Sequence, residues 1–143
     1  MTPPALDRDV VHLKLRAVRE LLDDLDSLPG LTVQQLDRER LLRHAVERIL
    51  TQLVELAAGI NSHVAAALLG AGPVTYRESF GLAARAGVLS EELAGRLAPS
   101  AGMRDVLVHE YVEVQFDQIV AGTARARTDY RDYVASVADF LSR

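Results

Sequence analysis

Apolar residues recur every three or four positions along most of the chain, a spacing typical of amphipathic helices. The first such segment covers about residues 6–28, and most of its charged residues lie off the apolar stripe. The stripe consists of Val11, Leu15, Val18, Leu22 and Leu25. Pro29 and Gly30 follow it and predict the end of this helix.

A second, longer helix is predicted from Thr32, which can cap its first turn, to about residue 69. Its stripe comprises Leu42, Val46, Ile49, Leu53, Leu56, Ile60 and Val64. At a rise of ~1.5 Å per residue such a helix would be roughly 55 Å long, which is long for a small domain. We therefore expect a kink near Gly59 or Asn61, or packing of part of the rod against a second copy of the chain.

Four more helices are predicted after residue 69. Thr75, with Glu78 three residues later, is a capping-box signature that opens a helix over residues 76–86, and Gly87 closes it. Ser90 caps a short helix ending before Pro99, and further helices are expected at about residues 100–111 and 115–141. Strand-like alternation is nearly absent. The chain is predicted to be all-α, a helical bundle with short connections and a single domain over residues 1–143.

Composition supports this class and excludes several functions. With 143 residues, 49% apolar and 25% charged, the chain has the balance of one soluble globular domain. It has no apolar run long enough for a membrane span and no secretion signal, so we expect a cytoplasmic protein that does not bind membranes. The absence of cysteine excludes disulfides, zinc–thiolate sites and a thiol nucleophile.

Charge and the scattered histidines add little evidence for a site. The net charge of −4 means that bound nucleic acid would need a local cluster of arginines. His12, His44 and His63 lie at no metal-ligand spacing, and no metal site or cofactor is predicted. Three arginines recur on the last predicted helix and form either a solvated face or an auxiliary RNA or partner contact: Arg125, Arg127 and Arg131.

The segment from residue 102 to 111 carries the candidate chemistry. Within eight positions it brings together Arg104, whose planar cation matches a phosphate, and His109, which can act as general acid or base near neutrality. It also holds Tyr111, whose phenol can donate a hydrogen bond or accept a modifying group. On one continuous helix His109 would point ~140° away from Arg104, while Tyr111 would share its face. Either the helix unwinds near His109, or two copies of the segment meet across a dimer.

The run from Gly102 to Tyr111 resembles the signature of HEPN-domain proteins, and specifically the HepT toxins of HepT/MntA toxin–antitoxin modules. The resemblance covers nearly the whole chain. Glu47, Arg48 and the stretch at residues 60–63 look like the second helix of that family, and residues 76–80 and 87–89 look like its segment before the motif. The resemblance implies a homodimeric, up-and-down helical bundle with one long kinked helix.

The resemblance also implies a function: a metal-independent endoribonuclease with its active site at the dimer interface. Arg104 and His109 would be the catalytic residues, with Arg104 on the scissile phosphate and His109 transferring a proton. Tyr111 matches the tyrosine to which an MntA-like nucleotidyltransferase antitoxin adds AMP, which silences the toxin by placing bulk and negative charge where RNA binds.

One position departs from the family pattern. Asp105 stands where the family commonly has Asn, and its carboxylate could orient Arg104 or repel RNA. The residues themselves leave two other interpretations open. One is a non-catalytic module that uses this surface to bind a nucleotide or the antitoxin. The other is a purely structural helical dimer.

Overall fold

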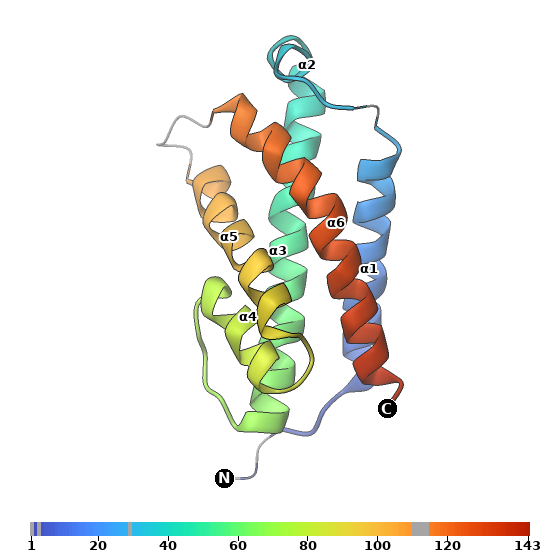
Figure 1. Ribbon diagram of the computed structural model, residues 1–143, viewed down its shortest axis with the longest axis vertical. Coiled ribbons are helices and arrows are strands. Elements are labelled where there is room, and N and C mark those ends of the chain that lie inside the picture. The colour runs from blue at the N-terminus through green and yellow to red at the C-terminus, as the bar shows by residue number, and fades with distance from the viewer. Residues whose placement is uncertain (1, 3, 29, 110–114) are drawn as a thin grey trace.

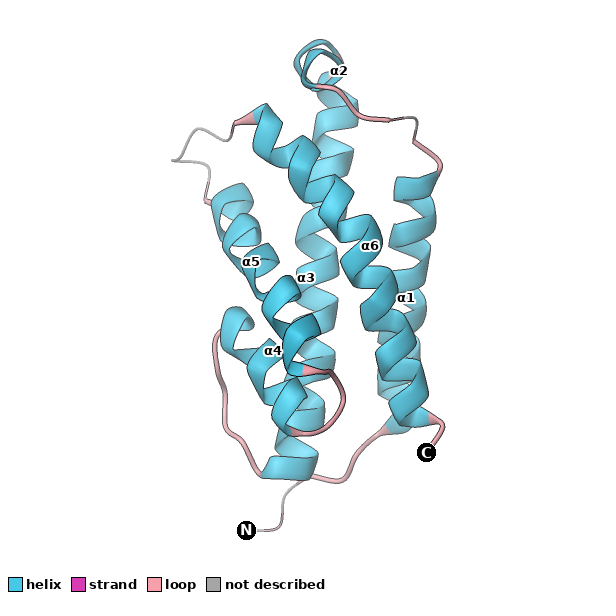
Figure 2. Ribbon diagram, viewed as in Figure 1, coloured by secondary structure: helices cyan, strands magenta, loops and turns pink. Residues whose placement is uncertain are grey.

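The computed structural model describes residues 2, 4–28, 30–109 and 115–143, and this part of the chain forms six α-helices and no strand (Figure 2). The helices are α1 (Arg8–Asp26), α2 (Val33–Arg38), α3 (Arg40–Leu69), α4 (Tyr76–Arg85), α5 (Glu91–Val108) and α6 (Phe116–Leu141). The all-α prediction is confirmed.

The long helix α3 is the centre of the bundle and contacts each of the other five helices. In Figure 1, α1 lies on one side of α3 and α4 and α5 lie on the other, while α6 crosses in front of α3 and ends beside α1. By length and hydropathy α3 is also the one described helix that could cross a membrane. Its contacts with five other helices are those of a core helix in a helical bundle.

The predicted apolar stripes form the core. All five stripe residues of α1 are at most 1% exposed, and Val46, Leu53, Ile60 and Val64 of α3 are equally buried. The predicted N-caps are also confirmed: Thr32, Thr75 and Ser90 each accept a backbone N–H from the residue three positions later, at 3.1 Å. Local signals therefore placed most helix starts correctly, because a cap satisfies N–H groups that the helix itself leaves unpaired.

The helix predicted from Thr32 to about residue 69 is divided at Glu39 into α2 and α3, and α3 continues without a break through Gly59 and Asn61, where a kink was expected. Gly59 faces α1, where the Lys14 Nζ lies 2.7 Å from the place that a methyl group on Gly59 would take. Asn61 is fully buried with its amide hydrogen-bonded to other helices, so it has no reason to compete with the helical backbone.

The expected helix end at Pro99 is also wrong, because α5 runs without interruption from Glu91 to Val108. Leu97 and Ala101, on either side of the proline, are buried in the core, and this packing favours a continuous helix. The Ser100 hydroxyl bridges the Leu97 carbonyl and the hydroxyl of Tyr130 on α6, at 2.6 and 2.7 Å. Tertiary contacts thus override a local helix-breaking signal.

The arginines of α6 do not form a simple solvated face. Arg127 donates to the Leu25 carbonyl at the end of α1 at 2.6 Å. Arg131 pairs with Asp23 and Asp26 of α1 at 2.9 and 2.7 Å. These two side chains therefore tie α6 to α1, and only Arg125 of the three remains an exposed candidate for a partner contact.

Candidate functional site

Arg104 lies in the last two turns of α5, where three helices supply its contacts. Its Nη2 donates to Glu55 Oε1 of α3 at 3.2 Å, and its Nη1 donates to the neighbouring Asp105 Oδ1 at 3.3 Å. The guanidinium carbon lies 4.7 Å from the ring centroid of Tyr76, the first residue of α4, which is the geometry of a cation–π contact. Two carboxylates and an aromatic ring therefore fix the plane of this cation.

A chain of buried hydrogen bonds holds Tyr76 in place. The Tyr133 hydroxyl of α6 donates to Asn61 Oδ1 at 2.7 Å and to the Ala57 carbonyl at 3.1 Å, both on α3. The Asn61 amide donates to Ser79 Oγ at 3.2 Å, and that hydroxyl donates to the Tyr76 carbonyl at 2.6 Å. Asn61, Ser79 and Tyr133 are each 0% exposed. The core thus fixes the first turn of α4, and with it the ring against which Arg104 packs.

The Arg104 side chain is charged and incompletely paired. Partial burial lowers the pKa of Arg104, but the hydrogen bonds to Glu55 and Asp105 outweigh it, so the pKa is raised above its usual value. Its side chain is 20% exposed, and the buried Nε has no hydrogen-bond partner among the described residues. The guanidinium has five N–H donors, and the described contacts use one on each terminal nitrogen. A second donor on each terminal nitrogen remains for an anion, whereas the Nε is buried.

His109 follows α5 directly. It is the C-cap residue, with extended backbone angles (φ −87°, ψ 94°), and its N–H donates to the Asp105 carbonyl at 3.1 Å. The residue is exposed. The α-helix therefore does not continue through His109, which is the first of the two alternatives drawn from the spacing. The geometry of a continuous helix no longer separates His109 from Arg104.

Of the remaining motif residues, Tyr111 lies outside the described residues. Asp105 is described, and its side chain is 60% exposed with one oxygen on Arg104. This contact supports the expectation that the Asp105 carboxylate orients Arg104. Because the carboxylate is exposed, it would also repel the phosphates of a bound RNA. His63, outside the motif, accepts the backbone N–H of Asp7 at 2.9 Å and joins α3 to the start of α1.

Sequence reasoning missed the two contacts that define this site. Glu55 is separated from Arg104 by 49 positions and Tyr76 by a whole helix, and no local spacing links them. The one general rule that could have pointed to Glu55 is that an arginine in a helical bundle needs a carboxylate partner when it is partly buried. Glu47 and Glu55 both lie on the long helix, and the sequence does not distinguish them; in the structure Glu47 pairs with Arg43 instead.

The sequence is similar to known proteins over most of its length. A family model described as "Ribonuclease HepT-like" matches residues 18–137. A protein of Aphanizomenon flos-aquae (strain 2012/KM1/D3) named "tRNA nuclease HepT" is 26% identical over 132 residues, which cover 92% of this chain and 90% of that protein.

Two solved structures share the fold. The tri-AMPylated HEPN toxin of Shewanella oneidensis, solved in complex with an MNT antitoxin, is 21% identical with a TM-score of 0.81, over 92% of this chain and 98% of the toxin. The cytosolic protein YutE of Bacillus subtilis, of unknown function, is 18% identical with a TM-score of 0.81, over 96% and 92% of the two chains. At these identities the likeness concerns the fold alone.

Proposed function

The chain belongs to the family of HepT-like ribonucleases, and on this premise we propose that it is the toxin of a toxin–antitoxin module, a cytoplasmic endoribonuclease that cleaves RNA without a metal ion. The proposal is carried by one observation. Arg104, in the segment that resembles the family's motif, is oriented by Glu55 and Tyr76 and keeps one unused donor on each terminal nitrogen.

Arg104 binds the scissile phosphate in this mechanism. A guanidinium can donate two parallel hydrogen bonds to the non-bridging phosphate oxygens, and it stabilises the extra negative charge of the pentacoordinate transition state. Because Glu55 and Tyr76 already orient the cation, little reorganisation is needed when RNA binds. The tethered position of Arg104 is therefore an advantage for catalysis.

His109 transfers the proton in this mechanism. The ribose 2′-oxygen attacks the adjacent phosphorus, the bond to the 5′-oxygen breaks, and the products are a 2′,3′-cyclic phosphate and a free 5′-hydroxyl. One imidazole accepts the 2′-hydroxyl proton or donates a proton to the 5′-oxygen. A homodimer that pairs two copies of the motif supplies a second imidazole for the other proton. No step requires a metal ion.

The partner in this proposal is an MntA-like nucleotidyltransferase antitoxin that adds AMP to Tyr111. The Shewanella toxin with the same fold is AMPylated and was solved in complex with an MNT antitoxin, which supports the proposal. AMP on Tyr111, seven residues after Arg104, would bring a negatively charged phosphate and a bulky base close to the RNA site.

The test is expression of the chain without its antitoxin, together with cleavage of total RNA and tRNA by the purified protein in EDTA. The wild type should arrest growth and cleave RNA, while His109→Ala and Arg104→Ala should fold, should not arrest growth and should lose most of the cleavage activity. A purified wild type that cleaves no RNA overturns the nuclease proposal and favours the non-catalytic binding module. Co-expression with the antitoxin should add mass in multiples of AMP, and Tyr111→Phe should abolish this gain.

A further inference from the structure

A groove opens beside Arg104, between the start of α4 and the end of α5. Its volume is about 480 Å³, and its lining residues are Val74, Thr75, Tyr76, Arg77, Arg104 and Asp105. Two of the six are arginines, and the groove includes the Tyr76 ring that packs on Arg104. The groove is therefore continuous with the cation to which the mechanism assigns the scissile phosphate.

Arg77 is the unexplained member of this groove. It is exposed, it follows Tyr76 in the first turn of α4, and its Nη1 lies 3.9 Å from where a methyl group on Gly102 of α5 would stand. Across the described ranges of the chain, no ion pair involves Arg77. An exposed arginine beside another helix, with no carboxylate partner among the described residues, is available for an anion from outside.

We propose that this groove binds a second phosphate of the RNA strand, a neighbour of the scissile phosphate, and that Arg77 is the residue that binds it. The inference rests on the proposed function, because it takes Arg104 as the site of the scissile phosphate. Arg77 then positions the strand by a phosphate contact that carries no sequence preference.

Arg77 borders two hollows, and the charges that line them indicate which one the RNA occupies. Arg77 also borders a second hollow between α4 and α5, which is lined by Glu78 and Glu91 as well as by Arg85. The two glutamates make that side unfavourable for a phosphate. On the other side Asp105 is the single acidic residue that lines the groove, and its carboxylate already binds Arg104. RNA is therefore directed towards Arg104.

The test compares Arg77→Gln with Arg85→Gln, a matched change of an exposed arginine at the other end of α4. Both are made in a His109→Ala background, and binding of a single-stranded RNA oligonucleotide is measured as a function of salt concentration. Arg77→Gln should weaken binding about tenfold, as expected for one charge-assisted contact. It should also reduce the slope of log affinity against log salt by about 0.7, the value for one phosphate. Arg85→Gln should change neither quantity.

Cleavage by the otherwise wild-type protein gives a second readout. Arg77→Gln should raise KM while kcat stays within about twofold, because Arg77 contacts the strand away from the reacting atoms. Equal RNA binding by the two variants overturns the inference even if the wild type is an active nuclease. So does an Arg77→Gln variant that loses antitoxin binding but not RNA binding, since the groove then belongs to the protein partner.

The two proposals fail in different ways. If the wild type binds RNA through Arg77 without cleaving it, the nuclease proposal is wrong and the proposal of a phosphate site at Arg77 stands. A wild type that binds no RNA overturns both.

Discussion

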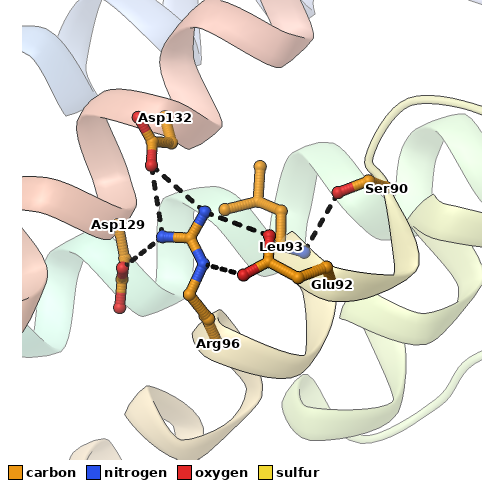
Figure 3. A network of polar contacts seen from close by, with 6 residues as sticks. All are labelled: Ser90, Glu92, Leu93, Arg96, Asp129 and Asp132. Carbon is orange, nitrogen blue, oxygen red and sulfur yellow. Dashed lines mark hydrogen bonds and ion pairs between the residues drawn. The ribbon is translucent and has the colours of Figure 1, made fainter.

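Arg96 and Arg104 lie eight residues apart on α5, and the two regions around them use the same side chain differently. All five N–H donors of Arg96 are engaged, by Glu92 on its own helix and by Asp129 and Asp132 on α6, at 2.7–3.3 Å (Figure 3). Arg104 makes two such hydrogen bonds, packs on an aromatic ring, and leaves its Nε without a partner among the described residues.

The difference supports a structural role for Arg96 and the proposed phosphate-binding role for Arg104. The hydrogen bonds to Glu92 and Asp129 raise the pKa of Arg96, and three carboxylates around one cation leave no place for a further anion. Arg104 has its orientation fixed while donors stay free, which is the arrangement that a phosphate site requires. Both residues are arginines on one helix, so only the saturation of the donors distinguishes their roles.

The largest effect expected is on cleavage. Arg104→Ala should reduce kcat by about 10²–10³, the loss found when one group that stabilises a transition-state charge is removed. Arg96→Ala should leave kcat within about twofold. Initial rates on a fluorogenic RNA measure both. Equal losses in the two variants would mean that the distinction between the two arginines is incorrect.

Stability should respond to the buried network behind Tyr76. Asn61→Ala removes one of the two hydrogen bonds made by each of the buried Tyr133 and Ser79 hydroxyls, and should lower the free energy of unfolding by about 2 kcal/mol. Arg96→Gln, at the surface, should lower it less, and the loss should shrink at high salt. Urea unfolding measures both. A larger loss in Arg96→Gln would show that the surface ion pairs contribute more stability than the buried network.

A smaller effect is expected from the carboxylate that orients Arg104. Glu55→Ala should lower kcat about tenfold, because the guanidinium loses its fixed plane, and Glu55→Gln should recover most of the rate through its amide oxygen. Glu47→Gln is the control, since Glu47 pairs with Arg43 on the same helix. If Glu55→Gln and Glu55→Ala are equally slow, the charge of Glu55 matters and its geometry does not.

The smallest effect is expected at Asp105. Asp105→Asn keeps a hydrogen-bond acceptor for Arg104 and removes an exposed negative charge, so RNA affinity should rise about two- to threefold at low salt. The gain should disappear at high salt, where exposed charges are screened. Titration of labelled RNA at two salt concentrations checks this, and a loss of affinity would assign the carboxylate a required orienting role.

Sequence patterns predicted best those features that depend on interactions between residues close together in the chain. The stripe of α1 and the caps Thr32, Thr75 and Ser90 follow from helical periodicity and from N–H groups that need an acceptor. The motif likewise identified Arg104 as the candidate phosphate ligand. Local signals failed at Pro99, where packing against neighbouring helices favours a continuous helix, and they did not indicate the break at Glu39.

The sequence by itself determined that this chain is helical, which face of each helix is buried, and which short segment carries an arginine and a histidine at the spacing of a ribonuclease family. The tertiary structure alone decided that Glu55 and Tyr76 hold Arg104, that Arg77 borders the same groove, and that Arg96 is fully paired. The physical reason is distance along the chain. Periodicity and capping act within a few residues, whereas the partners of a side chain come from helices that pack together only in the folded bundle.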